Sequence, residues 1–295
     1  MRRLRKLAVI GVGLVGGSFA LALRRAGFAG PTTGYDRDRS ALERAVALHA
    51  IDEIAESVSE ATRGADLVVV AVPVRAIGAV LHDVGLALDA KAVVTDVGST
   101  KAEVVAIARQ ELRERFARFV PGHPIAGREA SGIEAATLDL FKGARVVLTP
   151  TPETDPQATD FVRSAWEAAG ARVSSLSAVD HDRIFAAVSH LPHLLSFALV
   201  SEIASRTDSQ DLFSFAAGGF RDFTRIAASS PEMWRDIALQ NRAALLEELD
   251  RYAVRLTVFR ELIEKADGPA LERLMAEARS ARTAWAAPPR RAASE

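Results

Sequence analysis

Residues 7–36 read LAVIGVGLVGGSFALALRRAGFAGPTTGYD, and this stretch decides the fold class. The apolar run Leu7–Ile10 predicts a strand, and the glycines at positions 11, 13 and 16 follow it as GxGxxG before a helix-like segment. In this arrangement the first glycine permits a tight turn, the second lets a pyrophosphate approach, and the third lets helix pack on strand. Phosphates bind at the N-terminus of such a helix. The stretch therefore predicts a dinucleotide-binding turn.

An acidic residue stands where a ribose-binding carboxylate is expected. Asp36 ends the second predicted strand and lies 23 residues after Gly13. A carboxylate there hydrogen-bonds the ribose hydroxyls of NAD and repels the 2′-phosphate of NADP. Arg37 follows at once, so NADP use stays open, and a glycine-rich turn in a fold that binds no nucleotide is the alternative. The predicted cofactor-binding residues are Gly11, Gly13, Leu14, Val15, Gly16, Asp36, Arg37, Val72, Pro73 and Thr100.

Short apolar runs alternate with helix-like segments as far as about residue 177. Several of these runs lack polar alternation, as strands buried on both faces of a sheet do. This rhythm predicts a doubly wound parallel sheet, the α/β Rossmann type. The strand-like runs are Leu7–Ile10, Thr32–Tyr35, Leu67–Val72, Ala92–Thr95, Phe119–Val120, Arg145–Leu148 and Ala171–Ser175.

Strand signals stop after about residue 178, and apolar residues then recur every three or four positions. We therefore predict a Rossmann-type NAD-binding domain over 1–177, an all-α domain over 178–285 and a disordered tail over 286–295. The helical segments carry Leu, Ile, Val and Phe more densely than a lone helical unit needs. A homodimer through this domain follows as a hypothesis.

The composition is that of a globular protein with a substantial core. Of the 295 residues, 49% are apolar and 25% charged, and the formal net charge is −1. No global basic field attracts nucleic acid or anionic lipid, and the lack of cysteine excludes disulfides and thiol catalysis. The uncharged run Leu7–Leu23 after a basic start resembles a signal peptide, which is the alternative for that run. We expect a cytoplasmic protein with no nucleic-acid or membrane partner.

Polar residues follow several predicted strands, at the sheet edge where ligands bind in this fold. Ser99 and Thr100 open a helix after one strand, where they serve either as helix caps or as substrate contacts. His123 follows another strand in the stretch VPGHPIAGREASG. Pro124 biases it toward an extended conformation, so we expect it on a rigid loop, either as a packing residue or as an acid/base group.

The helical region supplies further candidates. His190 and His193 share a helix face in SHLPH, and Pro192 between them predicts a kink. A zinc pair is the alternative for these histidines, although no third ligand stands at helical spacing, and we predict no metal. Arg221 and Arg225 lie four residues apart in GGFRDFTRIA among aromatic residues that look buried, so a carboxylate partner is expected.

With these residues assembled, the sequence resembles the prephenate/arogenate (cyclohexadienyl) dehydrogenase family. The matching stretches are GVGLVGGS, AVPV, DVGSTK, GHPIAG, SHLPH, GGFRDFTRIA and PEMWRDI, in family order. The resemblance implies NAD(P)-dependent oxidative decarboxylation of prephenate to 4-hydroxyphenylpyruvate, or of arogenate to tyrosine. It implies that His123 and Ser99 are catalytic, and that substrate-binding residues are His193, Arg225, His190, Trp234 and Arg128.

Under this interpretation neutral His123 accepts the hydroxyl proton as hydride leaves, and Arg225 binds a substrate carboxylate. Arg128 departs from the small or hydroxyl residue more usual in the family, which leaves prephenate and arogenate both open. One rival is a β-hydroxyacid dehydrogenase, which needs a lysine in the helical domain. Lys265, near a helix end, is the only lysine after Lys142. The other rival is a non-catalytic NAD-sensing protein, which does not need His123, His193 and Arg225 together.

Overall fold

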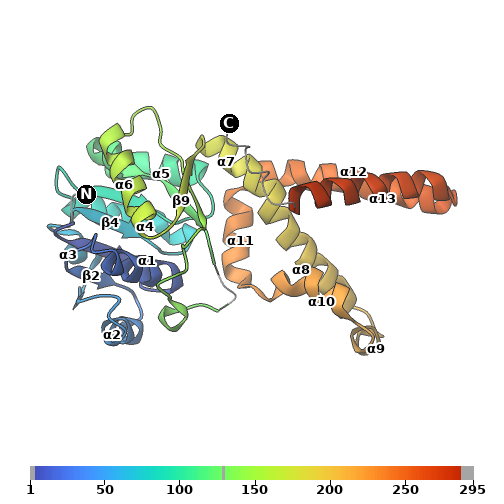
Figure 1. Cartoon of the computed structure of the whole chain (residues 1–295), viewed down its shortest axis with the longest axis horizontal. Helices are drawn as coiled ribbons and strands as arrows, with labels where there is room; N and C mark the ends of the chain where they lie inside the picture. Colours follow the sequence, from blue (N-terminus) through green and yellow to red (C-terminus); the bar gives the residue numbers. More distant parts are fainter. Residues whose placement is uncertain (1–3, 128–129, 287–295) are drawn as a thin grey trace, which may run out of the picture. The chain divides into compact units, whose positions relative to one another are not determined.

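The structure is a computed structural model that describes residues 4–127 and 130–286 (Figure 1). By their internal contacts the residues form two compact units, Met1–Leu245 and Leu246–Glu295. This division groups the first part of the helical region with the sheet. The boundary expected at residue 178 therefore stays a prediction, and most of the proposed tail lies outside the described residues.

A six-stranded parallel sheet forms the centre of the first unit. Its order, β3-β2-β1-β4-β5-β6, is that of the dinucleotide-binding fold, and it confirms the predicted fold class. The chain runs through β1, β2 and β3 on one half of the sheet and then crosses back to β4 on the other side of β1, so the carboxyl ends of β1 and β4 form the expected ligand crevice. The strands are β1 (Leu7–Ile10), β2 (Thr32–Tyr35), β3 (Glu53–Ile54), β4 (Leu67–Val70), β5 (Val93–Asp96) and β6 (Phe119–Val120).

Helices cover both faces of this sheet (Figure 1). Alternate residues of β1 enter different cores: Leu7 and Val9 pack toward α1, α2 and α6, whereas Ala8 and Ile10 pack toward α3, α4 and α5. Since Leu7–Leu23 forms β1 and most of α1 within these cores, the signal-peptide interpretation of that run is wrong. The helices are α1 (Leu14–Arg25), α2 (Arg39–Ala47), α3 (Val58–Thr62), α4 (Ile77–Ala87), α5 (Ala102–Leu112) and α6 (Pro156–Ala168).

A second, three-stranded sheet was not anticipated. It consists of β7 (Gly122–Ile125), β8 (Arg145–Leu148) and β9 (Arg172–Ser175), with β7 antiparallel to β8. His123 therefore lies in a strand, paired with Val147, and the expectation of a loop is wrong. Pro124 is tolerated because β7 is the edge strand of this sheet, where a missing N–H need not break a ladder.

The helical part begins with α7 (Ala178–Phe185), continues through one π-helical turn (Ala186–His190) and extends as α8 (Leu191–Ala204). The irregular turn precedes Pro192, where the sequence predicts a kink, and such π turns often occur at functional sites. Residues 178–204 are long and apolar enough to cross a membrane by length and composition, although the sequence singled out no such segment here. The same residues carry the buried His181 and Asp182 described below.

The remaining helices are short as far as Gln240. The apolar spacing of Pro231–Lys265 continues through two helices, because Asn241 separates α11 from α12. The second unit contains most of α12 and all of α13. The bounds are α9 (Ser209–Ser214), α10 (Gly218–Thr224), a 3-10 turn (Arg225–Ala228), α11 (Pro231–Gln240), α12 (Arg242–Glu264) and α13 (Gly268–Ala286).

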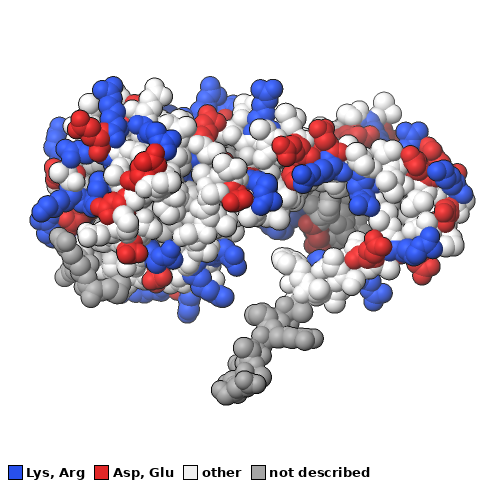
Figure 2. Space-filling model, turned by 90° about the horizontal axis from the view of Figure 1, so that it is seen from above, with Lys and Arg blue, Asp and Glu red and all other residues white. Residues whose placement is uncertain are grey.

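Charged side chains of both signs are mixed on the face shown in Figure 2. This distribution fits the small formal net charge of −1.

Candidate active site

A pocket of about 410 Å³ opens at the carboxyl ends of β1, β2 and β4. Six of the predicted cofactor residues line it, and Leu14, Val15, Gly16 and Thr100 do not. Asp36 is fixed at its rim, since its carboxylate accepts hydrogen bonds from the Val12 amide (2.9 Å) and the Asp38 amide (3.1 Å). The predicted residues in the lining are Gly11, Gly13, Asp36, Arg37, Val72 and Pro73.

The three motif glycines differ in what surrounds them. Gly11 has φ +95°, and a Cβ there would lie 2.2 Å from the Ala71 carbonyl oxygen. A Cβ on Gly16 would lie 2.1 Å from the Gly11 oxygen, whereas one on Gly13 would meet no atom within 4 Å. Gly11 and Gly16 are thus required by the fold itself, and Gly13 leaves space at the N-terminus of α1. This open cradle, with its free N–H groups, fits the pyrophosphate of NAD.

A buried ion pair lies at the end of β5. Lys101 and Asp96 are both fully buried, and the ammonium contacts the Asp96 carboxylate and donates to the Gly122 carbonyl oxygen at 2.8 Å. Asp96 also accepts from the Gly98 and Gly122 amides. Burial lowers the pKa of Lys101, and Asp96 acts against this shift. These bonds join β5 to the first residue of β7 and so fix the backbone that carries His123.

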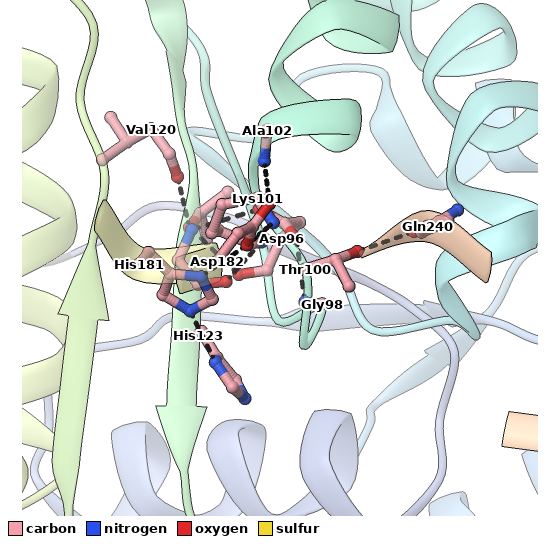
Figure 3. Close-up of polar contacts among 12 residues, drawn as sticks. Asp96, Gly98, Thr100, Lys101, Ala102, Val120, His123, His181, Asp182 and Gln240 are labelled. Atoms are coloured by element: carbon pink, nitrogen blue, oxygen red, sulfur yellow. Dashed lines mark hydrogen bonds and ion pairs between the residues drawn. The ribbon is translucent and has the colours of Figure 1, made fainter. Parts of the chain in front are cut away.

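His123 points at a second histidine, which the sequence did not suggest (Figure 3). Its Nδ1 lies 2.8 Å from Nε2 of His181, and Nδ1 of His181 lies 2.8 Å from Oδ1 of Asp182. The ring of Phe185 packs against His123 with centroids 4.9 Å apart. Burial, together with the nearby His181, Lys101 and His190, holds the pKa of His123 well below its ordinary value. The imidazole is therefore neutral at neutral pH, as a proton acceptor must be.

Asp182 also closes the N-terminus of α5. Its carboxylate accepts from the Lys101 and Ala102 amides, each at 2.8 Å. Of the two alternatives for Ser99 and Thr100, helix capping is wrong, because the Asp182 carboxylate from α7 accepts from the free amides instead. The hydroxyl of Thr100 instead donates to Oε1 of Gln240, at 2.6 Å.

In the helical part, His190 and His193 both contact the indole ring of Trp234, and the three side chains form one wall of the site. The His193 ring stacks on Trp234 with centroids 3.6 Å apart, and the His190 ring stands edge-on at 6.0 Å. Burial lowers the pKa of His190 to about 4 and also lowers that of His193. Asn241 Nδ2 donates to Nδ1 of His190 and to the Asp182 carbonyl oxygen, which connects this wall to the histidine pair.

Two donors on this wall are buried, Nε1 of Trp234 without a hydrogen-bond partner among the described residues, and Nε2 of His190 with only the Ser99 backbone close enough to act on the ring as a hydrogen-bond acceptor. Because the Nδ1 atom of His190 accepts from Asn241, its Nε2 carries the hydrogen. Buried donors of this kind are usually satisfied by water or ligand. Within the described ranges, no group of three or more His, Asp or Glu side chains is arranged to hold a metal ion.

The remaining predicted residues are less enclosed. Arg225 is exposed, and its charge is close enough to lower the pKa of His193, after the larger effect of burial. The aromatic flank is also more open than expected, since Phe223 is 53% exposed. Ser99 is half-buried beside the α5 terminus. Arg128 and Glu129 lie outside the described residues.

Sequence reasoning missed five residues of this centre, Asp96, Lys101, His181, Asp182 and Asn241. A signal for one of them was present: His181 lies four positions before Phe185 on α7, so a titratable side chain shares the apolar face of that helix. Asp96 and Lys101 are the first and last residues of the stretch DVGSTK, but their spacing does not predict that the lysine ammonium is fully buried.

Two family models match the chain. "Prephenate dehydrogenase, nucleotide-binding domain" covers residues 19–175, and "Prephenate dehydrogenase, dimerization domain" covers 177–277. A cyclohexadienyl dehydrogenase of Zymomonas mobilis is 36% identical over 95% of this chain and 96% of its own length. A prephenate dehydrogenase of Bacillus subtilis is also 36% identical, over 94% of this chain and 75% of its own.

Solved structures give the same picture. A prephenate dehydrogenase of Aquifex aeolicus, in complex with hydroxyphenyl propionate and NAD+, superposes with a TM-score of 0.89 at 39% identity. The match covers 96% of this chain and 98% of that one. Synechocystis arogenate dehydrogenase superposes with a TM-score of 0.81 at 34% identity, over 95% and 99% of the two chains.

The sheet order, the pocket beside the glycine turn and the neutral imidazole near the strand ends define an NAD-dependent dehydrogenase. The chain belongs to the prephenate dehydrogenase family. The resemblance predicted from its motifs is thereby confirmed.

Proposed function

We propose that the chain catalyses the NAD-dependent oxidative decarboxylation of prephenate, of arogenate, or of both, in tyrosine biosynthesis. The observation that carries the proposal is the neutral His123, held between a buried ion pair and His181 at the carboxyl edge of the sheet. The relatives named above act on substrates of this class.

In the proposed reaction, hydride leaves the carbinol carbon of the substrate as His123 accepts the hydroxyl proton. The ring carboxylate then leaves as CO2, its bonding electrons enter the ring, and the ring becomes aromatic. The oxygen takes the proton back from His123 and becomes a phenol, so the enzyme ends the cycle as it began. Proton transfer of this kind contributes about 10²–10⁴-fold to a rate. Aromatisation drives the loss of CO2, so neither a metal nor a Schiff base is required.

The pocket beside β1 would hold NAD, which supplies the hydride acceptor when bound. The pyrophosphate would bind at Gly13 and the N-terminus of α1, and the ribose hydroxyls at Asp36. We propose a preference for NAD over NADP, because the Asp36 carboxylate would repel a 2′-phosphate. Arg37 in the same lining is the group that would weaken this preference.

We propose that substrate lies between His123 and the wall formed by His190, His193 and Trp234. The buried Nε1 donor of Trp234 would bind an acceptor of the substrate or of water beside it, and Nε2 of His190 lies on the same wall. Arg225, whose charge reaches His193, would bind a carboxylate. Since that charge is lost if this carboxylate departs as CO2, Arg225 serves binding and orientation more than transition-state stabilisation. Ser99 at the α5 terminus would orient the ring hydroxyl.

We also propose a homodimer formed through the helical region of 178–286, in the cytoplasm. The family model that covers this region is described as a dimerization domain. Apolar side chains on its helices are strongly exposed in the single chain, among them Val188 (66%), Phe215 (88%) and Val254 (66%). Exposed apolar surface of this extent is typical of a surface that another chain covers.

The direct test is NADH or NADPH formation by purified protein with prephenate or arogenate, each with NAD or NADP. We expect reduction with NAD and at least one of the two substrates. Absence of reduction in all four mixtures would contradict the proposed function.

A further inference from the structure

The histidine pair is part of a longer chain of hydrogen bonds that ends on a carboxylate. From Asp182, the contacts run to Nδ1 of His181 and from its Nε2 to Nδ1 of His123, each step 2.8 Å long (Figure 3). His181 is fully buried, and Asp182 is 5% exposed. Because His181 and Asp182 are shielded from solvent, the hydrogen-bond partner of each ring nitrogen decides which nitrogen carries a hydrogen.

The carboxylate end fixes the first proton. Asp182 accepts two amide hydrogens at the N-terminus of α5, an 11-residue helix, where a negative charge is favoured. An ionised carboxylate has no hydrogen to give. Nδ1 of His181 must therefore donate to Asp182, and Nε2 of neutral His181 is left with a lone pair.

The second step follows from the first. Since Nε2 of His181 accepts, Nδ1 of His123 must donate to it. The hydrogen of neutral His123 is then used at Nδ1, and its Nε2 is left as a bare acceptor. This is the tautomer that removal of a proton from a substrate hydroxyl requires.

We propose that His181 and Asp182 are positioning residues that hold His123 in the tautomer with an unprotonated Nε2 and stabilise its positive charge while it carries the substrate proton. This inference rests on the proposed function. When Nε2 of His123 gains the proton, the hydrogen on Nδ1 moves toward Nε2 of His181, and the charge is shared with a ring that faces Asp182. When the proton returns to the product oxygen, the hydrogen moves back.

The charges around the pair support a temporary proton site. Burial lowers the pKa of His181, the hydrogen bond to Asp182 and the charge of Asp96 act against this shift, and Lys101 adds to it. Burial opposes protonation of His123 most strongly, and His181, Lys101 and His190 oppose it as well. His181 is therefore better placed than His123 to carry positive charge, because carboxylates face His181 and none is among the groups that act on His123.

Asp182→Asn tests the carboxylate end. The new amide can donate to Nδ1 of His181, which would turn that ring into a donor toward His123 and place the His123 hydrogen on Nε2. We expect kcat to fall by about 10²–10⁴-fold with little change in KM for substrate or NAD. If Asp182 is a helix cap alone, D182N would lower Tm but leave kcat of the folded protein at the wild-type value. Asp180→Asn, on the exposed side of α7, is the matched control.

His181→Gln and His181→Phe separate the two roles of the ring. The glutamine oxygen can accept from Nδ1 of His123 and keep the tautomer, but it cannot share the charge, whereas phenylalanine does neither. We expect kcat to decrease in the order wild type, H181Q, H181F. Equal kcat in all three proteins would overturn the proposal. His82→Gln, on an exposed histidine, is the control for loss of an imidazole.

The tautomer itself is measured by ¹⁵N NMR of histidine-labelled, ligand-free protein at neutral pH. We expect His123 to be protonated at Nδ1 and bare at Nε2 in the wild type, and the reverse in D182N. A wild-type His123 protonated at Nε2 would overturn the inference without any use of activity. Failure of the wild type to reduce NAD with either substrate would instead contradict the proposed function, so the two failures are distinguishable.

Discussion

The cofactor pocket and the histidine centre lie at the same edge of one sheet, yet they are built differently. The groups of the pocket expected to bind the cofactor's phosphates and ribose come from one continuous stretch, because the glycine turn and Asp36 both fall within residues 10–37, although the rest of the lining comes from residues 58–83. The histidine centre takes Lys101, His123 and His181 from segments separated by 22 and 58 residues. A local motif therefore reveals the first site, whereas the second depends on side chains that meet through the fold.

The largest effect on turnover is expected from substitution of His123, the proposed proton acceptor of the histidine centre. His123→Asn keeps a polar group of similar size but removes the basic nitrogen, so we expect kcat to fall by about 10²–10⁴-fold while KM for prephenate changes little. Steady-state kinetics of the variant and of the control H82N check this. Near-normal turnover of H123N would remove His123 from the acid/base role.

The next largest effect concerns stability, and it tests whether the buried Lys101–Asp96 pair beside the histidine centre holds the fold together. Lys101→Met leaves the fully buried Asp96 carboxylate without its ammonium, so we expect a loss of about 3–5 kcal/mol in the free energy of unfolding. Urea denaturation measures it. Lys91→Met, at an exposed position, should change stability by no more than about 0.5 kcal/mol. A similar small change for K101M would mean that the pair does not hold β5 to β7.

Acid should destabilise the histidine centre and leave the cofactor pocket less affected. The pKa of His190 is about 4 in the folded chain, against about 6.5 in the unfolded chain. Between these values the unfolded chain binds the extra proton, so stability is complete above pH 6.5 and falls as pH drops toward 4, by roughly 3 kcal/mol. The pKa values of His123, His181 and His193 are lowered too and act in the same direction. Denaturation across this range should show a shallower slope for His190→Gln than for H82Q.

The smallest effect separates two neighbouring glycines of the cofactor pocket. Gly13→Ala meets open space, so we expect unchanged stability without ligand and about a tenfold higher KM for NAD. Gly16→Ala places a Cβ against the Gly11 oxygen, so it should cost about 1–3 kcal/mol of stability even without NAD. Thermal denaturation with and without NAD distinguishes the two. Equal loss of stability in both variants would contradict this division.

These contrasts explain how far the sequence could predict the molecule. The parallel sheet was predictable because its strands are continuous apolar runs, and the motif glycines because backbone contact allows nothing larger at Gly11 and Gly16. The strand that contains His123 was not, because Pro124 argues against a strand unless the edge position in a second sheet is known. His181 was missed because its partner is 58 residues away, and no spacing rule joins them.

The capping of α5 teaches the same lesson at smaller scale. Ser99 and Thr100 are ordinary capping residues, and local rules assign the cap to them. In the folded chain the Asp182 carboxylate takes both amides, and the Thr100 hydroxyl bonds to Gln240 instead. A charged acceptor from a distant helix displaces a neutral local one because charge-assisted hydrogen bonds are stronger.

The central claim is that the NAD pocket and His123 together carry out oxidation coupled to decarboxylation. Its most direct test is the ratio of NADH to CO2 formed by wild-type protein from prephenate and from arogenate, each with NAD. The account predicts equal amounts of both products from at least one substrate, and loss of both in step in H123N. Failure of both substrates to yield NADH, or NADH without CO2, would contradict it.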